Sequence, residues 1–309
     1  MSRNICITSA EGNTAFSIAK LLLTAEPFKK EVGQITGLAL NANTEYCKKL
    51  QTLGAKITQH KPGRVRDTVT ILKDTKSDTL MLIPPAHANK IDITMELIEA
   101  AKRANIQNVC FMSAAGCDLA DRDAQPRLRE FIDLEALFMK LKGDEGTNTG
   151  SSSVIIRPGF YVENLLLYTP QAQEEGLIPI PVGQNTKFPP VALRDVARLA
   201  AHILTGKGKY GFSNEHRGQL LTMTGPMLLN GDELAQIATR VLGVEMKFDN
   251  VSEREARRVL RFRTDHDLSE MEYLLEYYSL VREGSHPTEP ADFFKTYKDE
   301  FMPKMTIQK

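Results

Sequence analysis

The stretch NICITSAEGNTAFSIAKLLL, residues 4–23, decides the fold class of this chain. Residues 4–8 are largely apolar and form a candidate buried strand, and the apolar side chains of residues 15–22 recur at the spacing of one helix face. A short turn that contains a single glycine, Gly12, joins the two. A buried strand that turns directly into an amphipathic helix is the repeating unit of an α/β protein.

Short apolar runs keep alternating with amphipathic stretches as far as Arg157. This alternation predicts a parallel sheet that is covered by helices on both faces. We expect a Rossmann-type, doubly wound α/β fold in which the first strand lies between the second and the fourth. The six expected strands span residues 4–8, 35–40, 55–58, 79–83, 108–112 and 153–157, and helices begin near residues 14, 45, 65, 91 and 128.

The second half of the chain has a different pattern and predicts a smaller α+β lobe over the carboxyl edge of the sheet. We expect residues 1–157 and about 190–206 to form the Rossmann domain, and residues 158–189 and 207–309 to form the smaller lobe. The elements expected in this half are helices at 191–204, 232–242, 252–281 and 291–301 and strands at 220–223 and 244–248.

The composition narrows the range of functions. Lys+Arg and Asp+Glu both number 39, so the formal net charge is zero and no broad basic surface for nucleic acid or an anionic membrane is predicted. The four cysteines show neither a Cys-x-x-Cys pair nor a Cys/His spacing typical of zinc, so no metal site is expected. The sequence shows no secretory leader and no apolar run of about 20 residues, which favours the cytoplasm, with the nucleus as an alternative.

The turn after the first strand is where a dinucleotide diphosphate would lie in this architecture, on the free N–H groups of a helix N-terminus. Glycines are favoured there, but Ser9 and Ala15 occupy the positions of the first and third glycine. Glu11 would repel a diphosphate unless it points away. The alternative is a plain strand–helix turn in which Glu11 caps the helix. The candidate cofactor contacts of this turn are Ser9, Ala10, Glu11, Gly12, Asn13 and Thr14.

Further cofactor contacts are expected where the other strands end at the same edge of the sheet. Asn41 follows the second strand, where the adenine ribose would lie, and an amide there favours neither NAD nor NADP. Asn43, Lys48 and Lys49 are candidates for contacting a 2′-phosphate, or the two lysines belong only to a solvated helix face. The ends of the fourth, fifth and sixth strands contribute Pro84, Ser113, Pro158 and Phe160.

Four stretches of the sequence carry a family resemblance, and RPGFYVEN at residues 157–164 is the most specific of them. The others are residues 5–22, residues 80–86 with the helix through 100–104, and residues 109–116. Together they resemble the NmrA-like family, atypical members of the short-chain dehydrogenase superfamily. Residues 273–278 and 293–294 are similar to fungal members, which implies a fungal source. The resemblance implies a site for NADP or NAD, which the missing glycines weaken or abolish.

The usual catalytic machinery of short-chain dehydrogenases is absent from this sequence. Those enzymes use a Tyr, a Lys four residues later and a Ser ahead of them, in which the Tyr transfers a proton. Ser113 stands at the place of the Ser, but the helix expected at 128–141 contains no Tyr, and Lys140 comes late in it. The remaining candidates for chemistry at the cleft are Ser113, Tyr161 and Asn164.

The resemblance and the missing pair favour a nucleotide-sensing regulator that acts on a protein partner. The alternative is an NAD(P)H-dependent reductase of a quinone, an imine or another small molecule, or a cofactor-independent enzyme that uses the same cleft. The Arg/Glu-rich residues 253–263 are either a solvated helix with ion pairs or a docking face for a partner.

Overall fold

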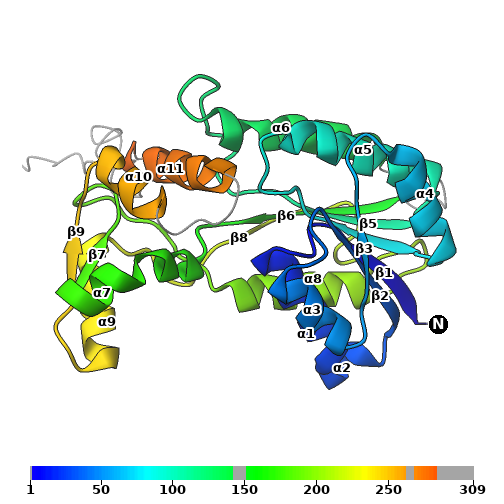
Figure 1. Ribbon diagram of the computed structural model, residues 1–309, viewed down its shortest axis with the longest axis horizontal. Coiled ribbons are helices and arrows are strands. Elements are labelled where there is room, and N and C mark those ends of the chain that lie inside the picture. Colours follow the sequence, from blue (N-terminus) through cyan, green and yellow to red (C-terminus); the bar gives the residue numbers. More distant parts are fainter. Residues whose placement is uncertain (1, 142–150, 262–267, 284–309) are drawn as a thin grey trace, which may run out of the picture.

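The computed structural model describes residues 2–141, 151–261 and 268–283. The helix expected at 291–301, the aromatic pair at 293–294 and most of the polar loop before residue 153 lie outside this part of the chain. Figure 1 shows a layered α/β arrangement, with a smaller group of elements beyond one edge of the sheet.

Seven parallel strands form the central sheet, in the order β3-β2-β1-β4-β5-β6-β8 (Figure 1). As expected, β1 lies between β2 and β4, and Ile5 pairs with both Ile35 and Thr79. This order is that of a Rossmann-type sheet. The strands are β1 (Arg3–Ile7), β2 (Val32–Ala39), β3 (Lys56–Gln59), β4 (Thr79–Leu82), β5 (Asn108–Met112), β6 (Ser152–Pro158) and β8 (Leu220–Met223).

The expected count of six strands was wrong by one, because β8 belongs to this sheet and not to the smaller lobe. Its residues pair in parallel with β6, from Ile155 with Leu220 to Pro158 with Met223. In β8 exposed residues alternate with half-buried ones, as in a strand at the edge of a sheet. The pairing covers the otherwise open side of β6.

Helices cover both faces of the sheet (Figure 1). On one face, α1 packs against α8, and their buried residues include Ile18 and Ala200. On the other face, α4, α5 and α6 lie side by side. The helices of the first face are α1 (Asn13–Thr24), α2 (Glu26–Lys29), α3 (Glu45–Thr52) and α8 (Leu193–Thr205), and those of the second are α4 (Val65–Asp74), α5 (Lys90–Arg103) and α6 (Pro126–Phe138) with the 3-10 turn η1 (Met139–Leu141).

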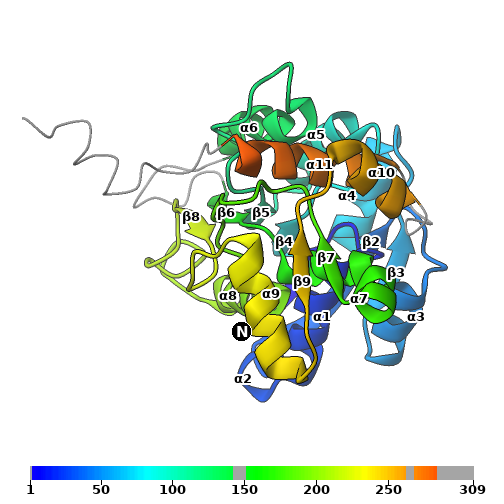
Figure 2. The same cartoon turned by 90° about the vertical axis from the view of Figure 1, so that its left-hand side faces the viewer.

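The smaller group of elements surrounds a two-stranded parallel sheet of β7 and β9 (Figure 2). The turn η2, α7 and β7 were not expected, because these short segments carry no clear periodicity. The group consists of η2 (Val162–Tyr168), α7 (Thr169–Glu175), β7 (Leu177–Pro179), α9 (Gly231–Leu242), β9 (Lys247–Asp249), α10 (Glu253–Arg261) and α11 (Leu268–Arg282).

One hydrophobic cluster connects this group to the sheet. It runs from Phe111 of β5 and Phe138 of α6 to Phe188 and the fully buried Tyr278 of α11. In addition, the Glu276 carboxylate of α11 accepts a hydrogen bond of 2.8 Å from the backbone N–H of Leu128. The α11 helix is therefore packed firmly over the carboxyl edge of the sheet. The boundaries expected for two separate domains stay a prediction.

Candidate functional site

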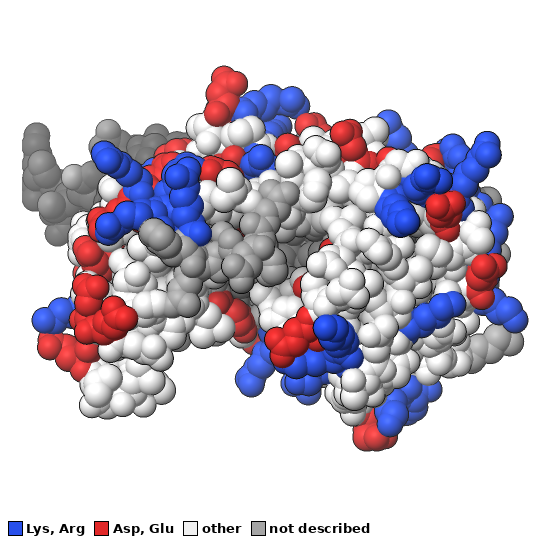
Figure 3. Space-filling model, viewed as in Figure 1, with Lys and Arg blue, Asp and Glu red and all other residues white. Residues whose placement is uncertain are grey.

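A cavity of about 710 Å³ lies at the carboxyl edge of the sheet. Its wall runs from the start of α1, past the ends of β4, β5 and β6, to α11. Figure 3 shows a hollow between the two halves of the molecule, on a face where acidic and basic side chains are interspersed. A cavity of this size is typical of cofactor and small-ligand sites.

Most of the residues expected at a cofactor or catalytic site line this cavity. They are Ser9, Gly12, Asn13, Thr14, Pro84, Ser113, Pro158, Phe160, Tyr161 and Asn164. Ala10, Glu11 and Asn41 do not line it. Ala10 is buried against β2, where its N–H donates to the Leu38 carbonyl, and the Asn41 amide oxygen accepts from the Asn43 N–H.

The turn before α1 has the backbone of a phosphate-binding loop although it lacks two glycines. Ser9 adopts a φ of +53°, in the left-handed region that favours glycine, and its hydroxyl donates to the Ile83 carbonyl at 2.8 Å. Gly12 is the N-cap of α1, and no side chain caps the helix. A Cβ at Gly12 would lie 3.3 Å from the Ser9 carbonyl oxygen, so the turn is tightly closed. The uncapped N–H groups therefore fit a diphosphate.

Glu11 neither caps α1 nor faces the diphosphate position. Its Oε1 atom accepts a hydrogen bond of 2.9 Å from the backbone N–H of Leu40, which directly follows β2. The carboxylate is thus turned sideways, towards the end of the neighbouring strand. The repulsion expected between Glu11 and a diphosphate over Gly12 is correspondingly reduced.

Tyr46 of α3 covers the start of α1, which the sequence did not indicate. Its ring stacks on Phe16 with the centroids 4.6 Å apart, and its hydroxyl donates to the Asn13 side chain at 2.5 Å. Tyr46, Phe16 and Asn13 all line the cavity. No pattern in the sequence could have found this contact, because Tyr46 and Phe16 lie on different helices.

A buried ionic network holds the side chain of Ser113, a candidate for chemistry, at the end of β5. Ser113 donates to the Glu135 carboxylate of α6 at 2.5 Å. Arg157, from β6, binds the same carboxylate through two hydrogen bonds of 2.8 and 2.7 Å. The hydrogen bonds to Glu135 are the main reason that the pKa of Arg157 is raised. Because a serine has one hydroxyl proton, Ser113 in this arrangement cannot also donate it to a substrate.

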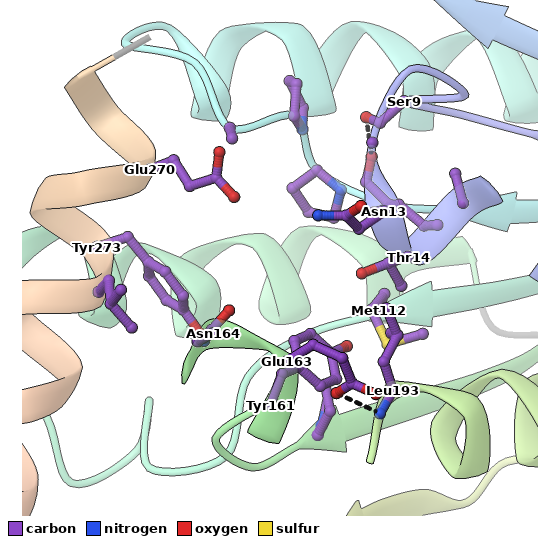
Figure 4. A pocket seen from close by; sticks show the side chains of 18 of the residues that line it. Ser9, Asn13, Thr14, Met112, Tyr161, Glu163, Asn164, Leu193, Glu270 and Tyr273 are labelled. Carbon is purple, nitrogen blue, oxygen red and sulfur yellow. Dashed lines mark hydrogen bonds between the residues drawn. The ribbon is translucent and has the colours of Figure 1, made fainter. Parts of the chain in front are cut away.

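Tyr161 and its neighbours form the opposite wall of the cavity (Figure 4). The Tyr161 hydroxyl is hydrogen-bonded to Thr14 at the start of α1, and burial raises its pKa well above the usual value for a phenol. The Glu163 carboxylate accepts from the backbone N–H of Leu193 at the start of α8. These contacts hold the segment after β6 against two helix N-termini.

The far end of the cavity is an aromatic chamber, formed by Phe131, Phe160, Tyr273 and Tyr277. Tyr273 projects from α11 into the pocket, on the side opposite the loop before α1 (Figure 4). Tyr273 and Tyr277 lie four residues apart on one predicted helix. That spacing is the signal by which the sequence could have assigned them to the site.

Lys90 is the buried cation beside this chamber. Its ammonium group lies 4.2 Å from the centre of the Phe131 ring and 3.0 Å from the Glu130 carboxylate, and it donates to the Arg127 carbonyl. Burial lowers its pKa, and Glu130 opposes this effect. Lys90 thus lies in the cavity wall beside α6, the helix that was expected to hold the usual catalytic Tyr and Lys.

Within residues 2–141, 151–261 and 268–283, no group of three or more His, Cys, Asp or Glu side chains is placed to hold a metal ion. No helix in the same part of the chain is long and apolar enough to cross a membrane.

The comparisons with known proteins agree with this architecture. A model of the NmrA-like family matches residues 1–302. The NAD(P)H azoreductase of Xenophilus azovorans is 22% identical over 258 residues, which cover 83% of this chain and 80% of that protein. The structure of an NADPH-dependent quinone oxidoreductase of Escherichia coli, complexed with NADPH, covers 94% of this chain and 93% of its own, with a TM-score of 0.71 and 20% identity.

The structure of NmrA, a negative transcriptional regulator in complex with NADP, covers 100% of this chain and 88% of its own, with a TM-score of 0.69 and 16% identity. These structural neighbours share the Rossmann-like fold of this chain, and they include both an oxidoreductase and a regulator. The family model extends over nearly the whole chain. The protein therefore belongs to the NmrA-like family.

Proposed function

We propose that this protein is an NAD(P)H-dependent reductase of planar, largely apolar small molecules. The observation that carries the proposal is the shape of the cavity, which runs continuously from the uncapped start of α1 to the aromatic chamber. One end suits a diphosphate, and the other suits a flat, unsaturated ring system. The azoreductase and quinone oxidoreductase relatives support this class of substrate.

The residues of this chain have defined roles in such a reaction. When bound, the reduced nicotinamide would supply a hydride. Pro158 and Met112, which line the cavity at the ends of β6 and β5, would bound the position of the reacting ring, while Phe160 and Tyr273 would hold the substrate flat against it. The rate would depend on proximity and orientation, because α6 (Pro126–Phe138) contains no tyrosine to act as a proton donor.

The proton for a reduced substrate would come from Tyr161 or from water. Tyr161 is protonated at neutral pH, as any phenol is, and burial raises its pKa further; its hydroxyl lies beside Thr14 in the cavity wall. Ser113 would fix Glu135 and would not act on the substrate. We therefore expect brisk reduction of quinones or azo compounds and negligible reduction of simple ketones, which need a strong proton donor.

A nucleotide-sensing regulator is the second candidate, and the commitment of the Ser113 proton to Glu135 favours it. A regulator needs the nucleotide to bind but needs no proton donor. The Arg-rich α10 is partly offset by ion pairs. Arg257 is paired with Glu253 and with Glu272 of α11, and Arg258 with Glu255, but the helix still carries four arginines against two glutamates.

The test combines binding with turnover. The protein is titrated calorimetrically with NADH, NADPH and their oxidised forms, and oxidation of the reduced forms is then followed with quinones, azo compounds and simple ketones. Binding together with oxidation by quinones or azo compounds supports the reductase. Binding without turnover of any acceptor contradicts the reductase and favours the regulator. Failure to bind any nucleotide contradicts both.

The variant Asn13→Glu tests the location of the diphosphate. Asn13 is exposed in the first turn of α1, where a carboxylate favours the helix but repels a bound diphosphate. We expect binding of all four nucleotides to weaken by about 10-fold or more. The control is Asn214→Glu, which makes the same change at an exposed position far from the cavity. Asn214 lies near the amino-terminal edge of the sheet, since the N–H of nearby Phe212 donates to Ser152 at the start of β6. Equal affinities in the two variants would place the diphosphate elsewhere.

A further inference from the structure

The Glu11 carboxylate occupies a position that matters for the choice between NAD and NADP. Glu11 comes from the phosphate-binding turn, but its Oε1 atom lies 2.9 Å from the Leu40 nitrogen, one residue beyond the end of β2. The turn is attached to this strand a second time, because the Ala10 N–H donates to the Leu38 carbonyl at 2.9 Å. The carboxylate is therefore fixed beside the carboxyl end of β2.

In Rossmann-type sheets the adenine ribose lies at the end of the second strand. An acidic side chain there accepts a hydrogen bond from the ribose 2′-hydroxyl of NAD, whereas an arginine there accommodates the 2′-phosphate of NADP. In this chain the residue that normally decides the choice is Asn41, an amide whose side-chain oxygen is already used by the Asn43 N–H. The negative charge comes instead from Glu11.

The candidates for contacting a 2′-phosphate on α3 are the exposed Lys48 and Lys49. Lys49 is bound to Glu45 at 2.6 Å on the same helix, so much of its charge is already offset. The field of Glu11 reaches the start of α3: burial raises the pKa of the Cys47 thiol, and the Glu11 carboxylate raises it further. A doubly charged 2′-phosphate placed there would be repelled.

We propose that Glu11 selects NAD(H) over NADP(H) through its negative charge beside the end of β2, which repels a 2′-phosphate. This inference rests on the nucleotide binding of the proposed function and adds the identity of the nucleotide. It sets this chain apart from the quinone oxidoreductase solved with NADPH and from the triphenylmethane reductase of Citrobacter sp., solved with NADP(H).

The experiment is a pair of calorimetric titrations, NADH and NADPH, on the full chain at low and at moderate ionic strength. We expect NADPH to bind about 10- to 100-fold more weakly than NADH at low salt. The difference should narrow as salt is added, because screening weakens the repulsion of the phosphate, while NADH affinity changes less. A wild-type chain that binds NADPH as tightly as NADH, or more tightly, overturns the inference and leaves the proposed function intact. A chain that binds neither overturns both.

The variant Glu11→Gln separates the charge from the fold. Its amide oxygen can still accept from the Leu40 N–H, so the turn keeps its contact with β2. We expect its NADH-to-NADPH preference to fall to within about threefold, chiefly through tighter NADPH binding, with an unchanged melting temperature. The control is Glu26→Gln, which removes the same charge from an exposed site on α2 and should keep the wild-type preference. A wild-type preference that persists in Glu11→Gln contradicts the assignment.

Discussion

At the scale of single residues, the Glu135 side chain holds Ser113 and Arg157 in place at the ends of β5 and β6. Its carboxylate, 9% exposed, receives two hydrogen bonds from Arg157, which is 12% exposed, and one from Ser113. We expect Glu135→Ala to lower the free energy of unfolding by about 3–5 kcal/mol, because the largely buried Arg157 guanidinium keeps only the half-exposed Asp118 carboxylate, 3.1 Å away. Urea denaturation measures this loss.

The control for Glu135 is a pair of the same type on the surface. Glu99 binds Arg103 along α5, with side chains 43% and 54% exposed. Such exposed pairs contribute at most about 1 kcal/mol, so Glu99→Ala should change the stability little. A similar loss in the two variants would mean that the buried network contributes no more than a surface ion pair, and that Ser113 is not held by it.

The sequence identified most residues of the site but not the directions in which they point. Strand ends at one edge of a parallel sheet are brought together by the topology, so Ser9, Ser113 and Tyr161 could be assigned to one cavity in advance. The direction of Glu11 depends on the N–H of Leu40, and the proton of Ser113 depends on Glu135. These partners are 29 and 22 residues away in the sequence, and no local pattern specifies them.

At the scale of elements, α11 carries a group of buried phenols that makes stability depend on alkaline pH. Burial raises the pKa of Tyr277 to about 12, and burial likewise raises the pKa values of Tyr273 and Tyr278 well above the usual value. In the unfolded chain these phenols ionise near pH 10. The stability that they contribute is therefore complete below pH 10 and is lost as the pH rises towards 12.

We expect the free energy of unfolding to fall steeply above about pH 10, by up to about 1.4 kcal/mol per pH unit for each such tyrosine. Tyr277→Phe should make this fall shallower, because it removes one titrating group and keeps the ring. Leu274→Ala, at a buried position of the same helix, should lower the stability at every pH by about 2–5 kcal/mol without changing the slope. Urea denaturation curves, recorded at about every pH unit from pH 8 to 12, test the expectations for the two variants. Parallel curves for Tyr277→Phe and the wild type would contradict the assignment.

The elements that the sequence predicted well are those with strong, local periodicity. The strand at residues 108–112 and the helix at 45–52 need only their own pattern of apolar residues. By contrast, β8 has no fully buried residue, and its membership of the main sheet depends on its register with β6. The short turn η2 also has no periodic signal, although it carries Asn164 into the cavity wall. Pairing between distant segments was thus the part that sequence patterns could not supply.

At the scale of the whole molecule, the cavity is built from both halves of the chain. The loop before α1 lies on one side and α11 on the other, and a single hydrophobic cluster continues from the helices over the sheet into α11 (Figure 4). A ligand that fills the cavity would contact both sides at once. Its binding energy would then stabilise the described parts of the fold together, and not the sheet alone.

We therefore expect NADH at 100 times its dissociation constant to raise the free energy of unfolding by about 2.7 kcal/mol, in a single transition. Far-ultraviolet circular dichroism follows the whole fold. Because the chain has no tryptophan, tyrosine fluorescence can also be followed, and it reports in large part on Tyr273, Tyr277 and Tyr278 of α11. Because the two halves share one core, both signals should shift together. Asn13→Glu, with an affinity about 10-fold lower, should shift by only about 1.4 kcal/mol at the same NADH concentration. A separate tyrosine transition that ignores the nucleotide would contradict this prediction and would show that the smaller lobe unfolds independently.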